Sequence, residues 1–175
     1  MNRQPTLRGE LLELRPLRAD DFGPLYAVAS DPLVWEQHPD RERWREEVFR
    51  AYFDEQLASG GGLAVVDRST GSPIGSSRYH DYDAERSEVE IGWTFLGRAY
   101  WGGAVNAELK RLMLGHAFES VDRVVFCIAH ENVRSQRSVE KLGARRAGER
   151  RGMLLYELSG RGPALRRSPS LHSTR

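Results

Sequence analysis

The chain has 175 residues, of which 39% are hydrophobic and 29% charged, and its formal net charge at pH 7 is +1. This length and composition are typical of one soluble globular domain that is large enough to bury a core. Because no run of about twenty apolar residues occurs and the first residues lack the apolar stretch of a signal peptide, we expect neither a membrane span nor export, and therefore a cytoplasmic location.

The spacing of apolar side chains predicts, in order, a strand, two helices, three strands, a helix, a strand, a helix and two strands. Residues 89–95, for example, alternate apolar and polar side chains as a half-buried strand does. The three glycines at 60–62 end the second helix, because glycine accepts the left-handed conformation of a helix cap. The expected elements cover residues 11–17, 20–30, 41–59, 63–67, 74–80, 89–95, 105–118, 124–129, 132–142, 144–150 and 153–159.

The turn between residues 97 and 104 carries Gly102 and Gly103 immediately before the third helix. Backbone N–H groups can converge there on an anion, at the end of the helix where its dipole is positive. The glycines are equally consistent with a tight turn that only connects a strand to a helix. On spacing alone, both interpretations stay open.

Residues 124–129 are apolar at both alternating positions, which is typical of a strand buried on both faces. We expect this strand to lie parallel to residues 89–95, with the third helix as the crossover between them. The separated ends of such parallel strands are where α/β sheets bind ligands. Cys127, the only cysteine, lies within this run and is predicted to be a buried small hydrophobe and neither a nucleophile nor a metal ligand.

Positive charge is concentrated at the end of the chain. Residues 161–175 contain four arginines and no acid, so the remainder carries a net charge of about −3. We expect a single domain over residues 1–160, followed by a flexible basic tail over residues 161–175. A nucleic-acid partner would need a basic face with interleaved aromatic residues, which the chain does not offer, so none is predicted.

Two motifs and the order of the elements resemble one family. The segments WGGAVNAE at residues 101–108 and NVRSQRSVEKLG at residues 132–143 are similar to the GNAT superfamily of acetyl-CoA-dependent N-acetyltransferases. With RPLRADD at residues 15–21, they resemble the branch that contains the ribosomal-protein alanine N-acetyltransferases. This resemblance implies an α/β fold, in which about four helices flank a mixed, mostly antiparallel sheet of about seven strands with one splayed parallel pair.

The resemblance implies acetyl-CoA as cosubstrate and no metal. The phosphate signature of the family, Q/R-x-x-G-x-G/A, matches at Gly102 and Ala104, but Ala99 stands at the basic position and Arg98 is one residue early. Because the signature acts through backbone amides, the missing side chain weakens the match without removing the chemistry. The residues implied to hold the coenzyme are Thr94, Phe95 and Leu96 along the pantetheine, Gly97, Arg98, Trp101, Gly102, Gly103 and Ala104 around the pyrophosphate, and Asn132 and Ser135 on the same arm.

Attack on a thioester requires a neutral amine, whereas an aliphatic amine is protonated near pH 7, so a group must accept a proton. Glu90 is the first candidate base, because it points away from the face that carries Val89 and Ile91 and the family often places its base on this strand. A solvated strand face or an ion pair is the alternative. Glu88 is the second candidate, and His80 and His130 are weaker candidates as relays.

The leaving thiolate would benefit from a proton donor. Many relatives place a tyrosine seven residues after the helix-opening asparagine, but here that position is Val139. Ser135, which fits the N-x-x-S pattern, is the predicted substitute. It is equally consistent with a residue that only supports the helix start or touches the coenzyme.

The acceptor site is expected between residues 34 and 46 and near the loop at residues 81–86. Trp35, Glu36, His38 and His80 are the candidate substrate-binding residues. Together with Glu42 and Glu46, the first three are expected to form an aromatic and acidic pocket for a cationic amine. A peptide N-terminus, a polyamine, an amino acid or an aminoglycoside antibiotic would fit. No membrane partner is expected, and a homodimer is left open. The alternative function is a catalytically inactive acyl-CoA-binding sensor or interaction module of the same fold.

Overall fold

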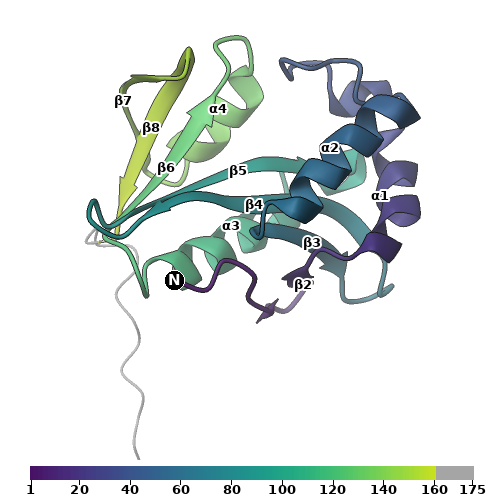
Figure 1. The fold of residues 1–175 in the computed structure, drawn as a ribbon, viewed down its shortest axis with the longest axis horizontal. Coiled ribbons are helices and arrows are strands. Elements are labelled where there is room, and N and C mark those ends of the chain that lie inside the picture. The colour runs from purple at the N-terminus through teal and green to yellow at the C-terminus, as the bar shows by residue number, and fades with distance from the viewer. Residues whose placement is uncertain (161–175) are drawn as a thin grey trace, which may run out of the picture.

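One sheet of eight strands organises residues 1–160, the part of the chain that the computed structural model describes (Figure 1). The predicted tail, residues 161–175, lies outside the described residues. The strands follow the order β1-β2-β3-β4-β5-β6-β8-β7, and every neighbouring pair is antiparallel except β5 and β6. Their bounds are β1 Leu7–Arg8, β2 Leu12–Pro16, β3 Gly62–Asp67, β4 Pro73–Asp83, β5 Glu88–Leu96, β6 Arg123–Ile128, β7 Arg145–Arg150 and β8 Met153–Ser159.

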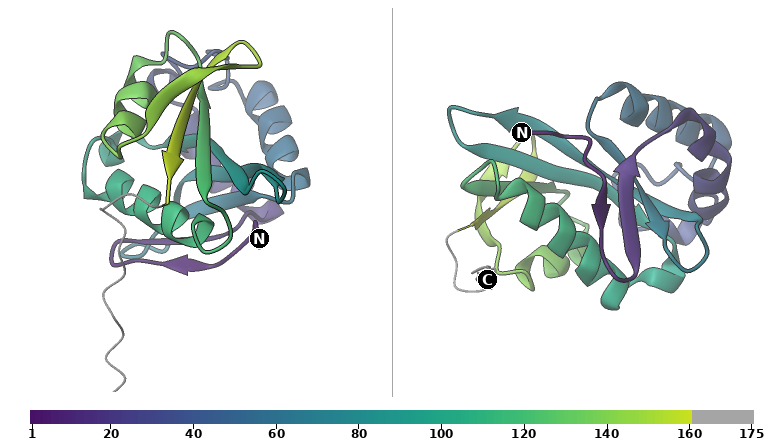
Figure 2. Two further views of the ribbon diagram at one scale, coloured as in Figure 1. Left: turned by 90° about the vertical axis from the view of Figure 1, so that its left-hand side faces the viewer. Right: turned by 90° about the horizontal axis from the view of Figure 1, so that it is seen from below.

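Helices cover both faces of this sheet. Helices α1 and α2 lie together on one face, and α3 crosses the opposite face, as the view from below shows (Figure 2). Helix α4 follows β6 at the end of the sheet that carries β7 and β8 (Figure 1). The α-helices of the described residues are α1 Phe22–Ala29, α2 Glu46–Ala58, α3 Ala104–Ala117 and α4 Val133–Glu140, and short 3-10 turns cover Ala19–Asp21, Pro32–Val34 and Arg98–Tyr100.

Each face of the sheet buries its own apolar cluster. Under α1 and α2 the cluster is mainly aromatic, and the rings of Phe49 and Phe95 meet edge to face with centroids 5.8 Å apart. Under α3 it is mainly aliphatic, with Leu109 and Met113 fully buried against the strands. Apolar area removed from water on both faces holds the sheet between its helices. The strand β5 therefore has a fixed position from which to present side chains.

The predicted fold class is confirmed: a mixed, mostly antiparallel sheet with one parallel pair and four flanking helices. The sheet has one strand more than the seven expected. The extra strand, β1, has two residues, which is too short for a period-two pattern to be visible in the sequence. It forms because it pairs with β2 and the intervening turn closes with a 2.8 Å hydrogen bond from Gly9 N–H to the carbonyl of Leu12.

Two local expectations are wrong. Helix α2 begins at Glu46 and not near residue 41, because the preceding residues form turns in which the Arg45 amide donates to the carbonyl of Glu42 at 2.9 Å. Cys127 is half-buried and not enclosed, because its side chain faces the end of the sheet where β5 and β6 separate. Burial and the nearby Glu90 carboxylate raise the pKa of its thiol, which agrees with an unreactive cysteine.

Candidate active site

A cleft of about 390 Å³ opens where the parallel strands β5 and β6 part. The two strands pair only from Glu88 to Glu90 with Arg123 to Val125, and beyond Glu90 they diverge. Helices α3 and α4 and the segment from Val34 to Arg43 complete the walls. A cleft at the carboxyl ends of parallel strands, of a volume that suits a small molecule, is the expected ligand site of such a sheet.

Beyond Glu90, β5 has no sheet partner on its β6 side, although it stays paired with β4 as far as Leu96. The backbone of residues 91–96 therefore presents an open edge to the cleft. Trp93 adopts a left-handed conformation with φ of 52°, and its carbonyl accepts a 2.7 Å hydrogen bond from the Tyr52 hydroxyl. The three residues predicted to follow the pantetheine, Thr94, Phe95 and Leu96, all line the cleft.

At the far end of β5 the glycine turn leads into α3. Gly102 has φ of 67°, and Gly103 is the N-cap of α3 with no side chain capping the helix. The first amides of an α-helix have no partner within the helix, and here they lie at an exposed turn beside the cleft. The structure thus places a helix N-terminus free of side-chain caps where an anion can approach it.

The residues predicted around the pyrophosphate divide into two groups. Trp101 and Gly102 line the cleft, and Gly103 and Ala104 follow them at the exposed start of α3. Arg98 pairs instead with Asp31, and the Gly97 amide donates to the carbonyl of Ile74 at 2.9 Å. These last two contacts hold the turn against the body of the protein and do not face the cleft lining.

Helix α4 forms the opposite wall. The Asn132 side chain caps this helix by accepting a 3.1 Å hydrogen bond from the Ser135 amide, which confirms the predicted helix start. Asn132 and Ser135 both line the cleft. The guanidinium of Arg134 stacks on the Trp101 ring at 3.8 Å from its centroid, and burial lowers its pKa. Helix α4 is thereby joined to the glycine turn across the mouth of the cleft.

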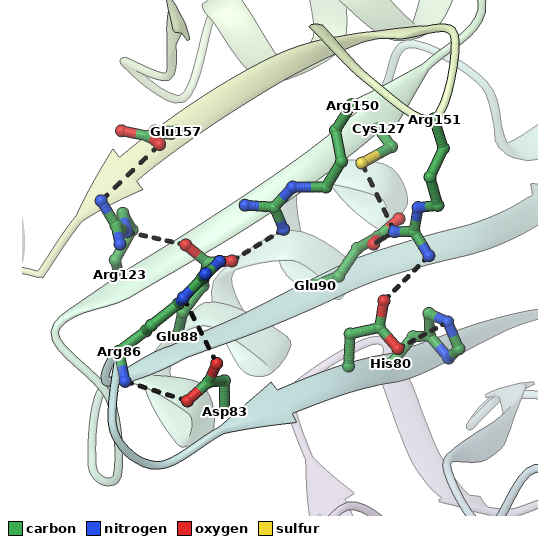
Figure 3. Close-up of polar contacts among 11 residues, drawn as sticks. His80, Asp83, Arg86, Glu88, Glu90, Arg123, Cys127, Arg150, Arg151 and Glu157 are labelled. Carbon is green, nitrogen blue, oxygen red and sulfur yellow. Dashed lines mark hydrogen bonds and ion pairs between the residues drawn. The ribbon is translucent and has the colours of Figure 1, made fainter.

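The two candidate bases have different surroundings (Figure 3). Glu88 is buried and forms two ion pairs, with Arg123 at 2.9 Å and with Arg150 at 2.8 Å, and it does not line the cleft. Glu90, only 1% exposed, lines the cleft and pairs with Arg151, which also reaches Asp81 at 2.8 Å. Among residues 1–160, Glu90 is the only carboxylate in the lining.

The acceptor side of the cleft is less acidic than the sequence suggested. Trp35 and His38 line it together with Arg43, whereas Glu36 is exposed outside the lining. Burial, reinforced by Arg43, lowers the pKa of His38 to about 4, so its imidazole is neutral at pH 7. His80 lies outside the lining, against the Trp93 ring at a centroid distance of 4.6 Å.

Sequence reasoning missed three cations that line the cleft: Arg43, Arg134 and Lys110. The position of Lys110 in the sequence does indicate that its side chain is buried. Lys110 stands three residues before Met113 and four before Leu114, and so on the buried side of α3, where a lysine is unusual. Within the described part of the chain, no group of histidine, cysteine and carboxylate side chains is arranged to hold a metal ion, and no helix is long and apolar enough to cross a membrane.

Comparisons with known proteins agree with this geometry. A family model described as "Acetyltransferase (GNAT) domain" matches residues 12–145. The N-acetyltransferase YnaD of Bacillus subtilis is 26% identical over 140 residues, which are 78% of this chain and 81% of YnaD.

Solved structures share the fold. A GCN5-related N-acetyltransferase from Brucella melitensis superposes with a TM-score of 0.78 at 19% identity, over 89% of this chain and 79% of that one. RimJ of Mycobacterium smegmatis, solved in complex with CoA-disulfide, gives 0.66 at 17% identity, over 85% and 81% of the two chains. With a family model that spans most of its length and a ligand cleft at the separated parallel strands, the chain belongs to the GNAT acetyltransferase family and is an N-acetyltransferase.

Proposed function

We propose that this N-acetyltransferase moves the acetyl group of acetyl-CoA to a primary amine, with Glu90 as the base that accepts the amine proton. The observation that carries the proposal is that Glu90 is the sole carboxylate in the cleft lining of residues 1–160, at the point where β5 and β6 separate. Glu88 is unsuited to this role because two arginines hold it outside the cleft lining.

The cleft suits coenzyme A in shape and chemistry. Its pyrophosphate would meet the backbone amides from Gly102 to Ala104, at the uncapped start of α3. Its pantetheine would pair with the open edge of β5 at Thr94, Phe95 and Leu96, as an added strand does. Arg98 and Gly97 then shape the turn without touching the coenzyme, since each has a partner elsewhere.

Acetyl-CoA supplies an activated acyl carbon, and the protein supplies the groups around it. Arg151 holds Glu90 by one carboxylate oxygen, Oε2, and the other oxygen, Oε1, lies beside Gly92, which has no side chain, so Oε1 is the atom proposed to accept the proton. The Ser135 hydroxyl, on the wall opposite β5, would donate a hydrogen bond to the sulfur. The buried position of Glu90 keeps this proton transfer away from bulk water.

The acceptor class follows from the charge of the lining. Arg43 and Arg134 line the cleft, and His38 beside them is neutral, so the site disfavours a substrate with several positive charges. We therefore propose an acceptor with a single ammonium group, such as a peptide N-terminus or an amino acid, over a polyamine or an aminoglycoside. Resemblance to the ribosomal-protein branch, and the likeness of the fold to that of RimJ, favour the peptide.

Release of the coenzyme thiol tests the proposed function. Acetyl-CoA is incubated with the protein and with peptides, amino acids, polyamines or aminoglycosides, and the new thiol is measured with a thiol reagent. We expect turnover with peptides or amino acids and little with polyamines. If coenzyme A binds but no amine is acetylated, the chain is the inactive acyl-CoA-binding module and the proposal fails.

Substitution of Gly102 tests the proposed pyrophosphate seat, by which we mean the backbone amides from Gly102 to Ala104. A Cβ there would meet no protein atom within 4 Å, but φ of 67° is strained for a β-branched residue. We expect Gly102→Val to shift the turn amides and to weaken coenzyme A binding by roughly tenfold or more, as measured by calorimetry. Gly71→Val is the matched control, since Gly71 has φ of 71° and equal space but lies in the turn between β3 and β4. Equal affinity of both variants would refute the seat.

A further inference from the structure

Lys110 is a buried cation without an anionic partner. Its side chain leaves α3 toward the cleft and is 7% exposed. The Nζ atom lies 3.5 Å from the Thr94 hydroxyl and 5.6 Å from the centroid of the Phe126 ring, and no ion pair with it is found within residues 1–160. Burying a charge this way is costly unless a ligand compensates for it, so Lys110 calls for a functional explanation.

The acidic and thiol groups around Lys110 are engaged elsewhere. Burial alone lowers the pKa of Lys110 to about 8, and no nearby carboxylate raises the pKa again. The acids and the thiol of β5, β6, α3 and α4, with their partners, are Glu88 with Arg123 and Arg150, Glu90 with Arg151, Cys127 with Arg151, Glu108 with the amides of Glu10, Leu11 and Leu12, and Glu140 with Tyr156. On β4, the Tyr79 hydroxyl donates to the Met113 carbonyl, and the other cations in the cleft lining are Arg43 and Arg134. An anion for Lys110 must therefore come from a ligand.

The position of Lys110 along α3 indicates which part of the coenzyme it meets. Lys110 is seven residues beyond Gly103, the N-cap, and at 1.5 Å per residue this places it about 10 Å deeper than the proposed pyrophosphate seat. It lies instead beside Thr94, on the open edge of β5. On the proposed path of the pantetheine, the group beyond the phosphates that becomes anionic is the sulfur.

We propose that the ammonium of Lys110 faces the sulfur of coenzyme A and gives it a proton as it leaves, an inference that rests on the proposed function. The amine nitrogen forms a bond to the acetyl carbon, the carbon–sulfur bond breaks, and sulfur takes that electron pair. Before the attack, Glu90 takes the ammonium proton of the acceptor and passes it to solvent. When the amide forms, Glu90 receives the second proton that nitrogen loses, and Lys110 becomes a neutral amine until solvent returns its proton. Atoms and charge balance without a further reactant.

The acidities of the two groups agree with this transfer. An alkyl thiol such as that of cysteine has a pKa of about 8.5, close to the pKa of about 8 that burial gives Lys110. A general acid works best when its pKa is near that of the group it protonates and near the operating pH. The Ser135 hydroxyl can donate a hydrogen bond to sulfur but is not acidic at neutral pH, so it orients the sulfur and Lys110 supplies the charge.

The test is a pH titration of the bound coenzyme thiol, followed by the ultraviolet absorbance of its thiolate, which needs no acceptor. In the wild-type protein we expect coenzyme A to ionise about one pH unit lower than in solution, because the ammonium stabilises the thiolate. In Lys110→Met the thiol should ionise at or above its solution value. Lys141→Met, which changes an exposed lysine outside the cleft lining, should keep the wild-type shift. If Lys110→Met titrates like the wild type, the assignment is overturned. If the wild-type protein binds no coenzyme A at all, the proposed coenzyme site is wrong, and the proposal for Lys110 fails together with the proposed function.

Thermal unfolding gives a second, independent readout. If Lys110 serves a ligand and not the fold, removing its buried charge should raise the Tm of the free Lys110→Met protein at pH 7 by roughly 2–4 °C. The folded pKa of Lys110, about 8, lies below its unfolded value near 10.5, so wild-type stability should rise between these pH values and close the gap. Lys110→Gln is the second variant should methionine fail to fold. A fall in Tm for both variants would show a structural lysine and contradict the proposal.

Discussion

The Glu90→Gln enzyme is expected to lose about 10²- to 10⁴-fold in kcat/KM at pH 7, because glutamine cannot accept the proton of the attacking amine. Its affinity for acetyl-CoA should stay close to that of the wild type, since Glu90 lies at the inner end of the cleft, away from the glycine turn. Glutamine also keeps an oxygen that can accept a hydrogen bond from Arg151, so the cleft should remain intact. Steady-state kinetics and calorimetric titration measure the two effects.

The pH dependence of Glu90→Gln separates a base from a binding residue. As pH rises toward the pKa of the amine, more acceptor is neutral before it binds, so part of the lost rate should return. A residue that only positions the substrate would show a constant deficit across pH. Unchanged kinetics in Glu90→Gln at neutral pH would sink the assignment.

Glu88→Gln is the matched control for Glu90→Gln. It makes the same change two residues away on β5, but it removes the charge that pairs with Arg123 and Arg150. We expect a lower Tm, because two arginines lose a buried partner, together with a pH–rate profile like that of the wild type. If Glu88→Gln loses as much rate as Glu90→Gln, the assignment of Glu90 as the base is contradicted.

Glu108→Ala is expected to destabilise the fold by about 3 kcal/mol, a fall in Tm of roughly 6–12 °C. The buried Glu108 carboxylate, 8% exposed, accepts hydrogen bonds of 2.8 Å from the amides of Glu10, Leu11 and Leu12. Alanine leaves these amides without acceptors and releases α3 from the start of β2. Chemical denaturation monitored by circular dichroism measures the change in the free energy of unfolding.

The pH dependence of unfolding identifies the cause. Burial raises the pKa of Glu108, but the three backbone donors and Arg111 outweigh it and bring the pKa below its usual value of 4.5. Its contribution is therefore complete above about pH 4.5 and is lost as pH falls through the lower folded pKa. The difference between wild type and Glu108→Ala should shrink in that acidic range. As a control, Glu46→Ala removes an exposed pair with Arg50 and should cost about 0.5 kcal/mol or less.

Most of the fold could be predicted because its signals are local. Strand alternation, the glycines at 60–62 and the Asn132 cap each act over a few residues, and the corresponding elements appear within a few positions of their predicted bounds. Strand β1 and the late start of α2 escaped prediction for the opposite reason. Strand β1 is held by pairing with β2, and the segment before α2 by contacts such as that between Arg43 and His38.

Much of the candidate site could also be located from the sequence. Glu90, Thr94, Gly102, Asn132 and Ser135 all lie in the cleft lining, because alternation on β5 and the two motifs set their direction or position. The proposed acidic pocket did not form. Glu42 and Glu46, which also belonged to it, pair with Arg45 and Arg50 at the surface. No local pattern specifies such side-chain partners, because they depend on which elements pack together.

From the sequence alone, the resemblance of two motifs implies the GNAT family, and local patterns predict an α/β fold with a glycine turn before a helix and an acid on the preceding strand. The predicted elements and the turn follow from local periodicity, capping and turn chemistry, whereas the family follows only from the resemblance. The tertiary structure places Glu90, and not Glu88, in the cleft lining, and the arginines that pair with them come from β6, from the end of β7 and from the turn between β7 and β8, which are distant in the sequence (Figure 3). It also placed Lys110 in the cleft without a counter-ion, since burial and solvation are properties of the packed chain.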